Sequence, residues 1–238
     1  MSNPSLPDLI LVMPIYNEEA NITQVISEWL PVLSNLGIRY ELFAINDGSK
    51  DRTLPILQSL ACEHPGNIVV IDKPNSGHGR SCRAGYERAL ERSARWILQI
   101  DSDGQCDPSY FPSFWSQREE ADCVFGFRST RGDGLVRKLI SRSCGVLSSL
   151  VSGVNVRDAN VPYRLMRNEA LAQALPRVPA DFDVQNIALT VALKRCQGIR
   201  WRYVPIHFRD RQGGVNSINI RKIAKMGWKM LNELRRVQ

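Results

Sequence analysis

The segment Asp101-Ser102-Asp103-Gly104-Gln105 has the residue types and spacing best suited to chemistry. Two carboxylates at positions i and i+2, where the backbone turns at a strand end, can point at one ion. Mg²⁺ and Mn²⁺ prefer oxygen ligands and accept the phosphates of a substrate beside them. Such an ion would neutralise the charge that develops on a diphosphate leaving group. Asp, Ser and Gly also form turns, so a turn without a metal explains the same residues equally well.

Polar residues also follow two other predicted strands. In the segment 46–49 (NDGS), Asp47 can hydrogen-bond a base or a ribose, as carboxylates do in dinucleotide-binding folds, or it can simply belong to a turn. In the segment 14–18 (PIYNE), Tyr16 offers an aromatic face on which a base can stack. That segment can instead be a strand end followed by a helix cap.

The periodicity of apolar residues predicts that strands and helices alternate through the first half of the chain. The predicted strands are 9–13, 40–46, 67–71 and 95–100, and the predicted helices run from the cap Asn17 to Asn35, from Asp51 or Thr53 to Glu63, and from Ser81 to Ser93. This alternation predicts an α/β fold with a mostly parallel central sheet flanked by helices. Ligands of such sheets bind outside the carboxyl ends of the strands, where Asp47 and Asp101 fall.

The second half of the chain is less regular. Its predicted strands are 121–127, 161–166 and 200–208, and its predicted helices are 135–151, 168–175 and 183–196. The strand 161–166 contains Pro162 near its start, which predicts a position near a sheet edge. We find no internal repeat and no low-complexity linker. We therefore expect one domain over residues 1–216, followed by a C-terminal amphipathic helix over residues 217–238.

The charge of the chain is concentrated at its C-terminus. The 238 residues contain 31 Lys and Arg against 24 Asp and Glu, a formal net charge of +7. Residues 201–238 hold nine basic and two acidic side chains, so this segment accounts for the whole excess. The neutral body argues against a nucleic-acid partner. The basic, amphipathic segment 217–238 can lie on an anionic membrane surface or can pack on the domain.

Composition excludes several other classes of protein. At 43% hydrophobic and 23% charged residues, the chain is globular. No apolar run approaches the ~20 residues of a membrane span, and the N-terminus lacks the pattern of a signal peptide. The six cysteines have no metal-binding spacing, and the three histidines have no ligand partners at a suitable spacing. We therefore expect a cytoplasmic protein with reduced thiols.

Together, these segments resemble family 2 glycosyltransferases, and more narrowly the polyprenyl-phosphate sugar transferases of the dolichol-phosphate mannose synthase type. VMPIYNEEANI is similar to VPxYNExxNI of the family, NDGSKDRT to DDGSxDxT, and IDSDGQ to DADLQ. The segments KPNSGHGRSCRAGYERAL, FGFRSTRGDG, RKLISR, VRDANVPYR and FRDRQGGVNSIN resemble later family motifs in the same order. Asn46 stands where the family usually has its first Asp. The resemblance implies a GT-A-like fold over nearly the whole chain.

The resemblance also implies roles for individual residues. It implies that Mg²⁺ or Mn²⁺ is held by Asp101, Asp103 and Gln105. It implies that the nucleotide-sugar donor is bound by Pro14, Tyr16, Glu18, Asp47, Asp101 and Ser217. It implies that the catalytic residues are Asp103, Asp158, Arg128, Arg137 and Arg211.

The nature of the acceptor decides which catalytic groups are needed. A phosphate monoester has a second pKa near ~6, so it is already a nucleophile at neutral pH and needs arginines to hold it. A sugar hydroxyl needs a general base instead, for which Asp158 is the candidate. The arginines 128, 137, 209 and 211 favour a phosphate acceptor. The alternatives are a saccharide or glycolipid hydroxyl as acceptor, or a non-catalytic nucleotide-sugar-binding subunit.

The resemblance thus implies an inverting enzyme of cell-envelope polysaccharide or glycolipid biosynthesis. Its acceptor would be a lipid phosphate, and it would work as a peripheral protein at the inner face of the membrane. Either the helix 217–238 or a separate membrane subunit would bring it there.

Overall fold

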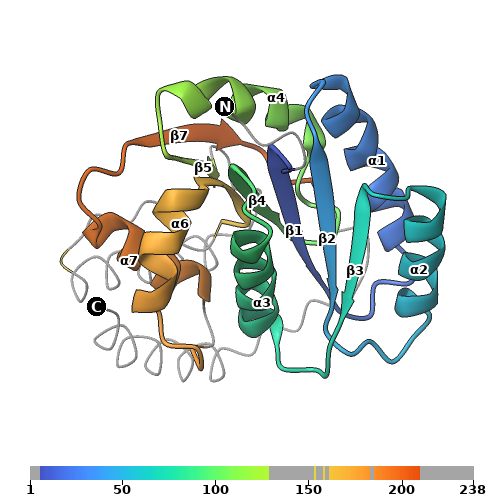
Figure 1. Cartoon of the computed structure of the whole chain (residues 1–238). Helices are drawn as coiled ribbons and strands as arrows, with labels where there is room; N and C mark the ends of the chain where they lie inside the picture. Colours follow the sequence, from blue (N-terminus) through green and yellow to red (C-terminus); the bar gives the residue numbers. More distant parts are fainter. Residues whose placement is uncertain (1–5, 129–152, 154–157, 159–160, 183–184, 210–238) are drawn as a thin grey trace, which may run out of the picture.

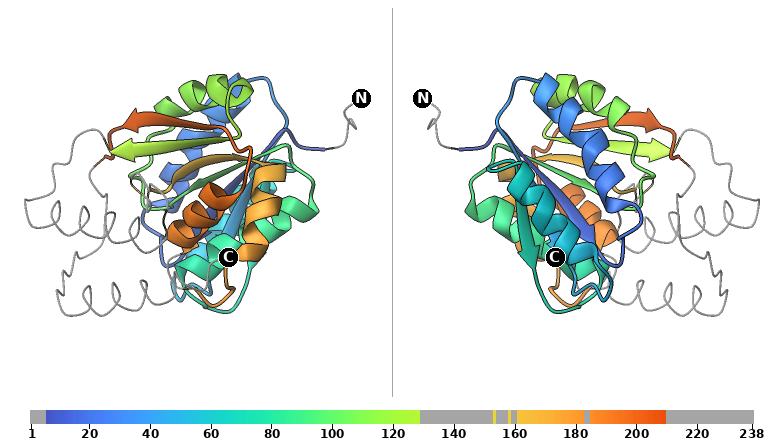
Figure 2. Two further views of the ribbon diagram at one scale, coloured as in Figure 1. Left: turned by 90° about the vertical axis from the view of Figure 1, so that its left-hand side faces the viewer. Right: turned by 90° about the vertical axis from the view of Figure 1, so that its right-hand side faces the viewer.

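The computed structural model of the chain describes residues 6–128, 153, 158, 161–182 and 185–209. One seven-stranded sheet runs through them in the order β3-β2-β1-β4-β6-β5-β7, with helices on both of its faces (Figures 1 and 2). The strands are β1 (Leu9–Ile15), β2 (Tyr40–Asn46), β3 (Ile68–Asp72), β4 (Trp96–Ile100), β5 (Cys123–Arg128), β6 (Tyr163–Arg167) and β7 (Trp201–Ile206). The helices are α1 (Ile22–Asn35), α2 (Thr53–Glu63), α3 (His78–Glu91), α4 (Phe111–Ser116), α6 (Asn168–Ala174) and α7 (Gln185–Arg195). Short 3₁₀ turns are η1 (Pro108–Tyr110), η2 (Gln117–Glu119) and η3 (Leu175–Arg177).

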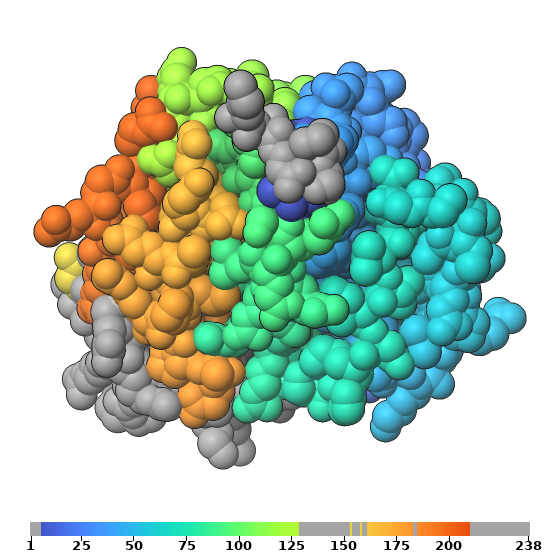
Figure 3. Space-filling model, in the orientation of Figure 1, coloured from blue at the N-terminus to red at the C-terminus, as the bar shows by residue number. Residues whose placement is uncertain are grey.

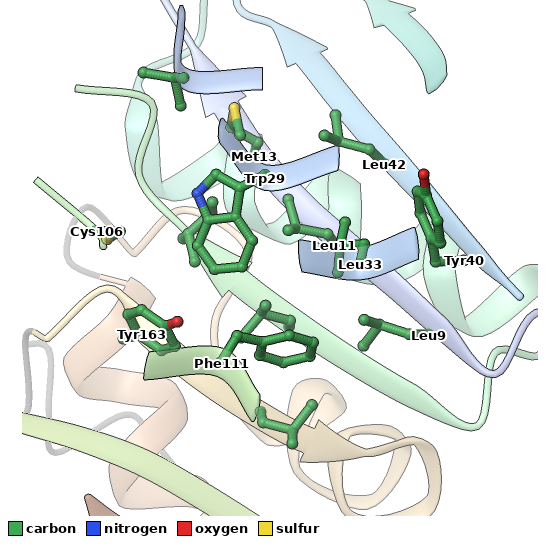
Figure 4. Packing of buried hydrophobic residues seen from close by; sticks show 14 of the residues in the cluster. Leu9, Leu11, Met13, Trp29, Leu33, Tyr40, Leu42, Cys106, Phe111 and Tyr163 are labelled. Carbon is green, nitrogen blue, oxygen red and sulfur yellow. The ribbon is translucent and has the colours of Figure 1, made fainter. Parts of the chain in front are cut away.

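Strand β1 separates two hydrophobic cores. All of its residues, LILVMPI, are buried, as expected for a strand covered on both faces. Because side chains alternate along a strand, Leu9, Leu11 and Met13 pack with the apolar side chains of α1 and α4 (Figure 4). Ile10 and Val12 face the other core, formed with α3, α6 and α7. On the face in Figure 3, α3 lies beside α6.

Parallel pairing brings the carboxyl ends of three strands to one edge of the sheet. β1 runs parallel to β2, with Leu9 opposite Tyr40 and Ile15 opposite Asn46, and it also runs parallel to β4. β2 and β3 are parallel as well. The prediction of a mostly parallel α/β sheet is confirmed. The polar segments that follow β1, β2 and β4 therefore meet in space.

The second half of the chain corrects one prediction. β6 lies between β4 and β5 and runs antiparallel to both, so the expectation of an edge strand is wrong. Pro162 immediately precedes the strand, whose first ladder residue is Tyr163 opposite Ile100. The N–H group that proline lacks is therefore not required by the ladder, and the strand can be central.

Helix boundaries also differ from the predictions. Asn17 does not cap α1, which begins at Ile22; it has a left-handed φ of 53° and bonds the loop after β2 instead. α3 begins at His78, before the predicted Ser81. The helical segment from η1 to η2 was not predicted. The predicted helices 135–151 and 217–238 lie outside the described residues. Among the described residues, no helix has the length and apolar character that crossing a bilayer requires.

Helix α3 packs closely against the sheet at Gly85. A Cβ atom added there would lie 2.3 Å from Cγ1 of Val12, so any other residue would force a neighbour to shift. The first turn of α3, which begins at His78, is thereby held against the carboxyl edge of the sheet.

Candidate functional site

A cleft of about 340 Å³ opens at the carboxyl edge of β1, β2 and β4. Six residues that the sequence analysis assigned to the donor or the metal line it: Pro14, Tyr16, Glu18, Asp47, Asp101 and Asp103. The cleft is also lined by residues that were not assigned: Ile15, Asn75, Gly77, His78, Ser81 and Ser102. Its size lies within the usual range for small-molecule sites.

Asp101 and Asp103 follow the buried end of β4 and both face the cleft. Gln99 Nε2 donates a hydrogen bond to Asp101 Oδ1 at 3.1 Å, and the backbone N–H of Gln105 donates to Asp103 Oδ1 at 3.2 Å. Gly104, with φ of 77°, makes the turn between them and Gln105. Burial raises the pKa of Asp101, and the charge of Asp103 adds to this effect. A bound cation would reverse it, because it favours the ionised carboxylate.

The donor set fits a divalent ion that is shared with a substrate. Within the described ranges, no group of three or more His, Cys, Asp and Glu residues could hold a metal by itself. Mg²⁺ is commonly held by one or two carboxylates together with substrate phosphates, and Asp101 and Asp103 match that pattern. Gln105 does not line the cleft: its Nε2 donates to the carbonyl oxygen of Arg209 at 3.1 Å.

Asp47 is a buried carboxylate that organises the loop before α3. It accepts hydrogen bonds from Lys73 Nζ and from the backbone N–H groups of Ser76 and Gly77, the latter two at 2.9 Å. Burial by itself would raise the pKa of Asp47, but these hydrogen bonds outweigh it and lower the pKa. Asn75 Nδ2 also donates to the Asp47 carbonyl oxygen at 2.8 Å. Asp47 therefore positions the first turn of α3 in the cleft.

Asn46, the departure from the family motif, has a local explanation. Its Nδ2 donates to Asp72 Oδ1 at 2.7 Å, and its Oδ1 accepts a hydrogen bond from Ser49 Oγ at 2.6 Å. A carboxylate at position 46 would place an acceptor against the acceptor of Asp72. The amide suits the neighbour that this chain has at the end of β3.

The loops after β1 and β2 are joined to each other. The backbone N–H of Asn17 donates to Ser49 Oγ at 3.0 Å, and its Oδ1 accepts from the Lys50 N–H at 2.8 Å. The backbone N–H of Glu18 donates to Thr53 Oγ1 at 2.9 Å. These bonds fix the wall of the cleft next to Tyr16, whose exposed fraction of 42% leaves its ring accessible to a ligand.

His78 also lines the cleft, although it has no ligand partner at a suitable spacing in the sequence. It begins α3, and its Nε2 lies 3.6 Å from Asp101 Oδ1 and 3.5 Å from Cys82 Sγ. The Cys82 sulfur, followed by the carboxylates of Asp101 and Asp103, raises the pKa of His78. Its flanking residues, Gly77 and Gly79, are the sequence signal that could have found it, because glycines often precede anion-binding helix N-termini.

The structure brings together Asp158 and Arg128, two of the predicted catalytic residues. The Arg128 N–H donates to Asp158 Oδ2 at 3.0 Å, and Asp158 has a left-handed φ of 46°. The guanidinium of Arg128 packs over the Phe208 ring, 4.8 Å from its centroid. Neither residue lines the cleft of about 340 Å³. The other three candidates lie outside the described residues: Arg137, Arg211 and Ser217.

Arg209 was also expected to hold a phosphate, but the structure pairs it with carboxylates. Its guanidinium contacts Glu28 of α1, and its Nη2 lies 2.9 Å from Asp107 Oδ1. It is not among the residues that line the cleft.

The sequence of residues 10–175, more than half of the chain, matches the model of the family described as "Glycosyl transferase family 2". The chain belongs to this family. The resemblance drawn from the motifs is confirmed.

Two curated relatives are named as polyprenyl-phosphate enzymes. An undecaprenyl-phosphate 4-deoxy-4-formamido-L-arabinose transferase from Shewanella sediminis is 29% identical over 73% of this chain and 52% of the relative. A dodecaprenyl-phosphate galacturonate synthase from Rhizobium johnstonii is 29% identical over 70% of this chain and 49% of the relative. The chain thus spans about half the length of these relatives.

A solved structure shares the fold. The crystal structure of glucosyl-3-phosphoglycerate synthase from Mycobacterium tuberculosis, in complex with Mg²⁺ and uridine-diphosphate, has a TM-score of 0.66 and 21% identity. The match covers 97% of this chain and 79% of that chain. At this identity the likeness concerns the fold alone, and it confirms the expected GT-A-like architecture.

Proposed function

We propose that this chain transfers a sugar from a nucleotide-sugar donor to a polyprenyl phosphate. The observation that carries the proposal is the convergence of Asp47, Asp101 and Asp103 on one cleft at the carboxyl edge of the sheet. The acceptor class is supported by the two relatives named for undecaprenyl phosphate and dodecaprenyl phosphate.

The donor would be bound by side chains from three strand ends. Pro14 and Tyr16 would contact the base, with Glu18 near the nucleoside. Asp47 is ionised at neutral pH, because its pKa is lowered, and would accept a hydrogen bond from the base or the ribose. The first backbone N–H groups of α3, beside His78, would face the diphosphate, since helix N-termini favour anions.

Asp101 and Asp103 would hold Mg²⁺ or Mn²⁺, which supplies charge stabilisation to the departing diphosphate. The relative solved with Mg²⁺ and uridine-diphosphate supports this choice of ion. Gln105 belongs to the same family motif, but it is not among the residues that line the cleft, so we assign the ion to the two carboxylates.

The acceptor phosphate would attack the anomeric carbon directly. One of its oxygens forms a bond to that carbon while the bond from the carbon to the donor diphosphate breaks, with inversion of configuration. The phosphate dianion needs no general base. It needs cations that offset repulsion by the diphosphate, and Arg128, Arg137 and Arg211 would supply them.

A hydroxyl acceptor is the second candidate, and Asp158 would then be the base. One of its oxygens already accepts the Arg128 N–H, so Asp158 has a structural use that does not depend on proton transfer. This observation favours the phosphate acceptor. Asp158→Asn distinguishes the two acceptors. A loss of turnover of ~10²-fold or more indicates that Asp158 is the base for a hydroxyl acceptor, and a mild loss indicates a phosphate acceptor. A non-catalytic binding subunit would show no turnover in either protein.

The enzyme would work at the inner face of a membrane, where a lipid phosphate presents its head group. The basic segment 217–238, beyond the predicted domain 1–216, would make a peripheral contact there. Deleting residues 219–238 should weaken sedimentation with anionic liposomes. If the truncated protein sediments as well as the full chain, a separate membrane subunit becomes the remaining route.

The decisive experiment is a thermal-shift screen of nucleotide sugars with and without Mn²⁺. A donor at about 100 times its Kd adds about 2.7 kcal/mol, which raises Tm by roughly 5–11 °C for a chain of this size. Asp103→Asn should lose the Mn²⁺-dependent part of the shift. Glu91→Gln, an exposed carboxylate at the far end of α3, is the matched control and should keep it. The proposal is wrong if no donor stabilises the protein with Mn²⁺ and no product forms with a polyprenyl phosphate.

A further inference from the structure

The side chain of Arg209 joins two separate parts of the structure. Its guanidinium contacts Glu28, on the surface of α1, and Asp107, at the start of η1, where Nη2 and Oδ1 are 2.9 Å apart. The Arg209 side chain is 36% exposed and that of Glu28 is 33% exposed, so both ends of the pair are shielded from water in part. A planar guanidinium can serve two carboxylates at once, which an ammonium group on a flexible stem does less well.

The backbone of Arg209 is tied to the loop that follows β4. Its N–H donates to the Gln105 carbonyl oxygen at 3.2 Å, and its own carbonyl oxygen accepts from Gln105 Nε2 at 3.1 Å. The Gln105 N–H in turn donates to Asp103 Oδ1 at 3.2 Å. A continuous chain of hydrogen bonds therefore runs from Arg209 through Gln105 to the carboxylate of Asp103.

The next two residues of the same loop, Cys106 and Asp107, are hydrogen-bonded to β6 and to the residue before it. Cys106 Sγ donates to the Pro162 carbonyl oxygen at 3.0 Å, and Tyr163 Oη donates to the Asp107 carbonyl oxygen at 3.2 Å. Asp107 Oδ1 also accepts from the N–H of Ser109, the second residue of η1, and so caps that turn. The bonds to Pro162 and Tyr163 connect the loop only to β6. Arg209 connects the same loop to α1, because it contacts both Asp107 and Glu28.

We propose that Arg209 is a positioning residue for the metal-binding loop: its side chain ties Asp107 of that loop to Glu28 of α1, and this holds in place the backbone of residue 209, which bonds Gln105 beside Asp103. This inference rests on the proposed metal site at Asp101 and Asp103. With Arg209 in place, Asp103 is ordered before the ion arrives. Without it, part of the binding free energy must order the loop, so the affinity for the ion falls while the fold persists.

The test measures the Mn²⁺ concentration that gives half of the thermal shift in the full chain. It is run with UDP or GDP, whichever stabilises the wild type. Arg209→Gln should raise this midpoint about tenfold, equivalent to about 1.4 kcal/mol, while Tm without ligand changes little. Arg209→Lys should recover part of the loss, because lysine keeps one ion pair. Arg202→Gln is the matched control: it removes an exposed arginine of the neighbouring strand β7, paired with Glu120 at 3.1 Å, and should leave the midpoint unchanged.

Glu28→Gln breaks the same ion pair without changing residue 209, so it tests the inference even if Arg209→Gln fails to fold. Glu28 lies on the surface of α1, outside the loop and the cleft, so its replacement should raise the midpoint about threefold without unfolding the protein. An unchanged midpoint in both Glu28→Gln and Arg209→Gln overturns the inference, and the proposed function stands if Asp103→Asn still abolishes the response. If Mn²⁺ does not stabilise the wild type, the metal site and this inference fall together.

Discussion

Restoring the usual family residue at position 46 should destabilise this chain. The structure places Asn46 Nδ2 2.7 Å from Asp72 Oδ1, and Asn46 is 1% exposed. Asn46→Asp would replace this donor with a carboxylate. The substitution therefore removes a hydrogen bond to a charged group and brings two carboxylates into contact.

The loss of stability can be estimated from the repulsion between the two carboxylates and from the cost of protonating one of them. At ~3 Å, two charges repel by about 1.4 kcal/mol in water and by about 5.5 kcal/mol at an effective dielectric constant of 20. Protonating one carboxyl at pH 7 instead costs about 4 kcal/mol, which sets an upper limit on the repulsion. Because Asp72 is exposed, we expect a total loss of about 2–4 kcal/mol, or roughly 4–16 °C in Tm.

The assay is thermal unfolding of a complete double-mutant cycle. Asp72→Asn alone should cost little, since an amide oxygen can still accept from Asn46. Asn46→Asp with Asp72→Asn should recover most of the stability, because the donor and the acceptor have exchanged sides. The loss in Asn46→Asp should also shrink towards about pH 4, where one carboxyl takes up a proton. A Tm of Asn46→Asp within about 1 °C of the wild type, or a double variant as unstable as the single one, would refute the reasoning.

Three other predictions address the residues that shape the cleft. Gly85→Ala should lose about 1–3 kcal/mol, because the new Cβ overlaps Val12 Cγ1, and adding Val12→Ala should return part of the loss in urea unfolding. Hydrogen bonds outweigh burial and lower the pKa of Asp47, so its ionised form contributes stability above the unfolded-state pKa. That contribution is lost as the pH falls through the lowered folded-state pKa, and Asp47→Asn should therefore flatten the dependence of the unfolding free energy on pH below about 4. His78→Ala should weaken binding of UDP or GDP by a few-fold to ~10-fold in calorimetry, whereas an equal affinity would remove it from the diphosphate site.

Local patterns were sufficient for the first half of the fold. The runs that form β1 to β4 are short, apolar and separated by helical periods, and these features depend only on nearby residues. Since parallel strands bring their carboxyl ends to one edge, the same pattern predicted that Asp47 and Asp101 share a site. The cleft contains both.

The failures have a common physical cause, which is that they depend on contacts distant in sequence. Pro162 indicated an edge strand, but the pairing of the next residue with β4 decides the position of β6. Asn17 is a good helix cap by type, yet its partners are Ser49 and Lys50, 32 and 33 residues away. Arg209 was counted among the arginines that could hold a phosphate, but its guanidinium pairs with Glu28 and Asp107, 181 and 102 residues away.

The ion pairs of Arg209 with Glu28 and Asp107 also remove one arginine from those that could hold an acceptor phosphate. The case for a phosphate rested on the number of arginines, and one of these now has a different use. Within the described residues the case rests on Arg128, whose backbone N–H bonds the only candidate base, Asp158. The two hypotheses therefore depend on neighbouring groups that can be changed separately. If the acceptor is a phosphate, Arg128→Gln should cost far more turnover than Asp158→Asn, and for a hydroxyl acceptor the order should reverse.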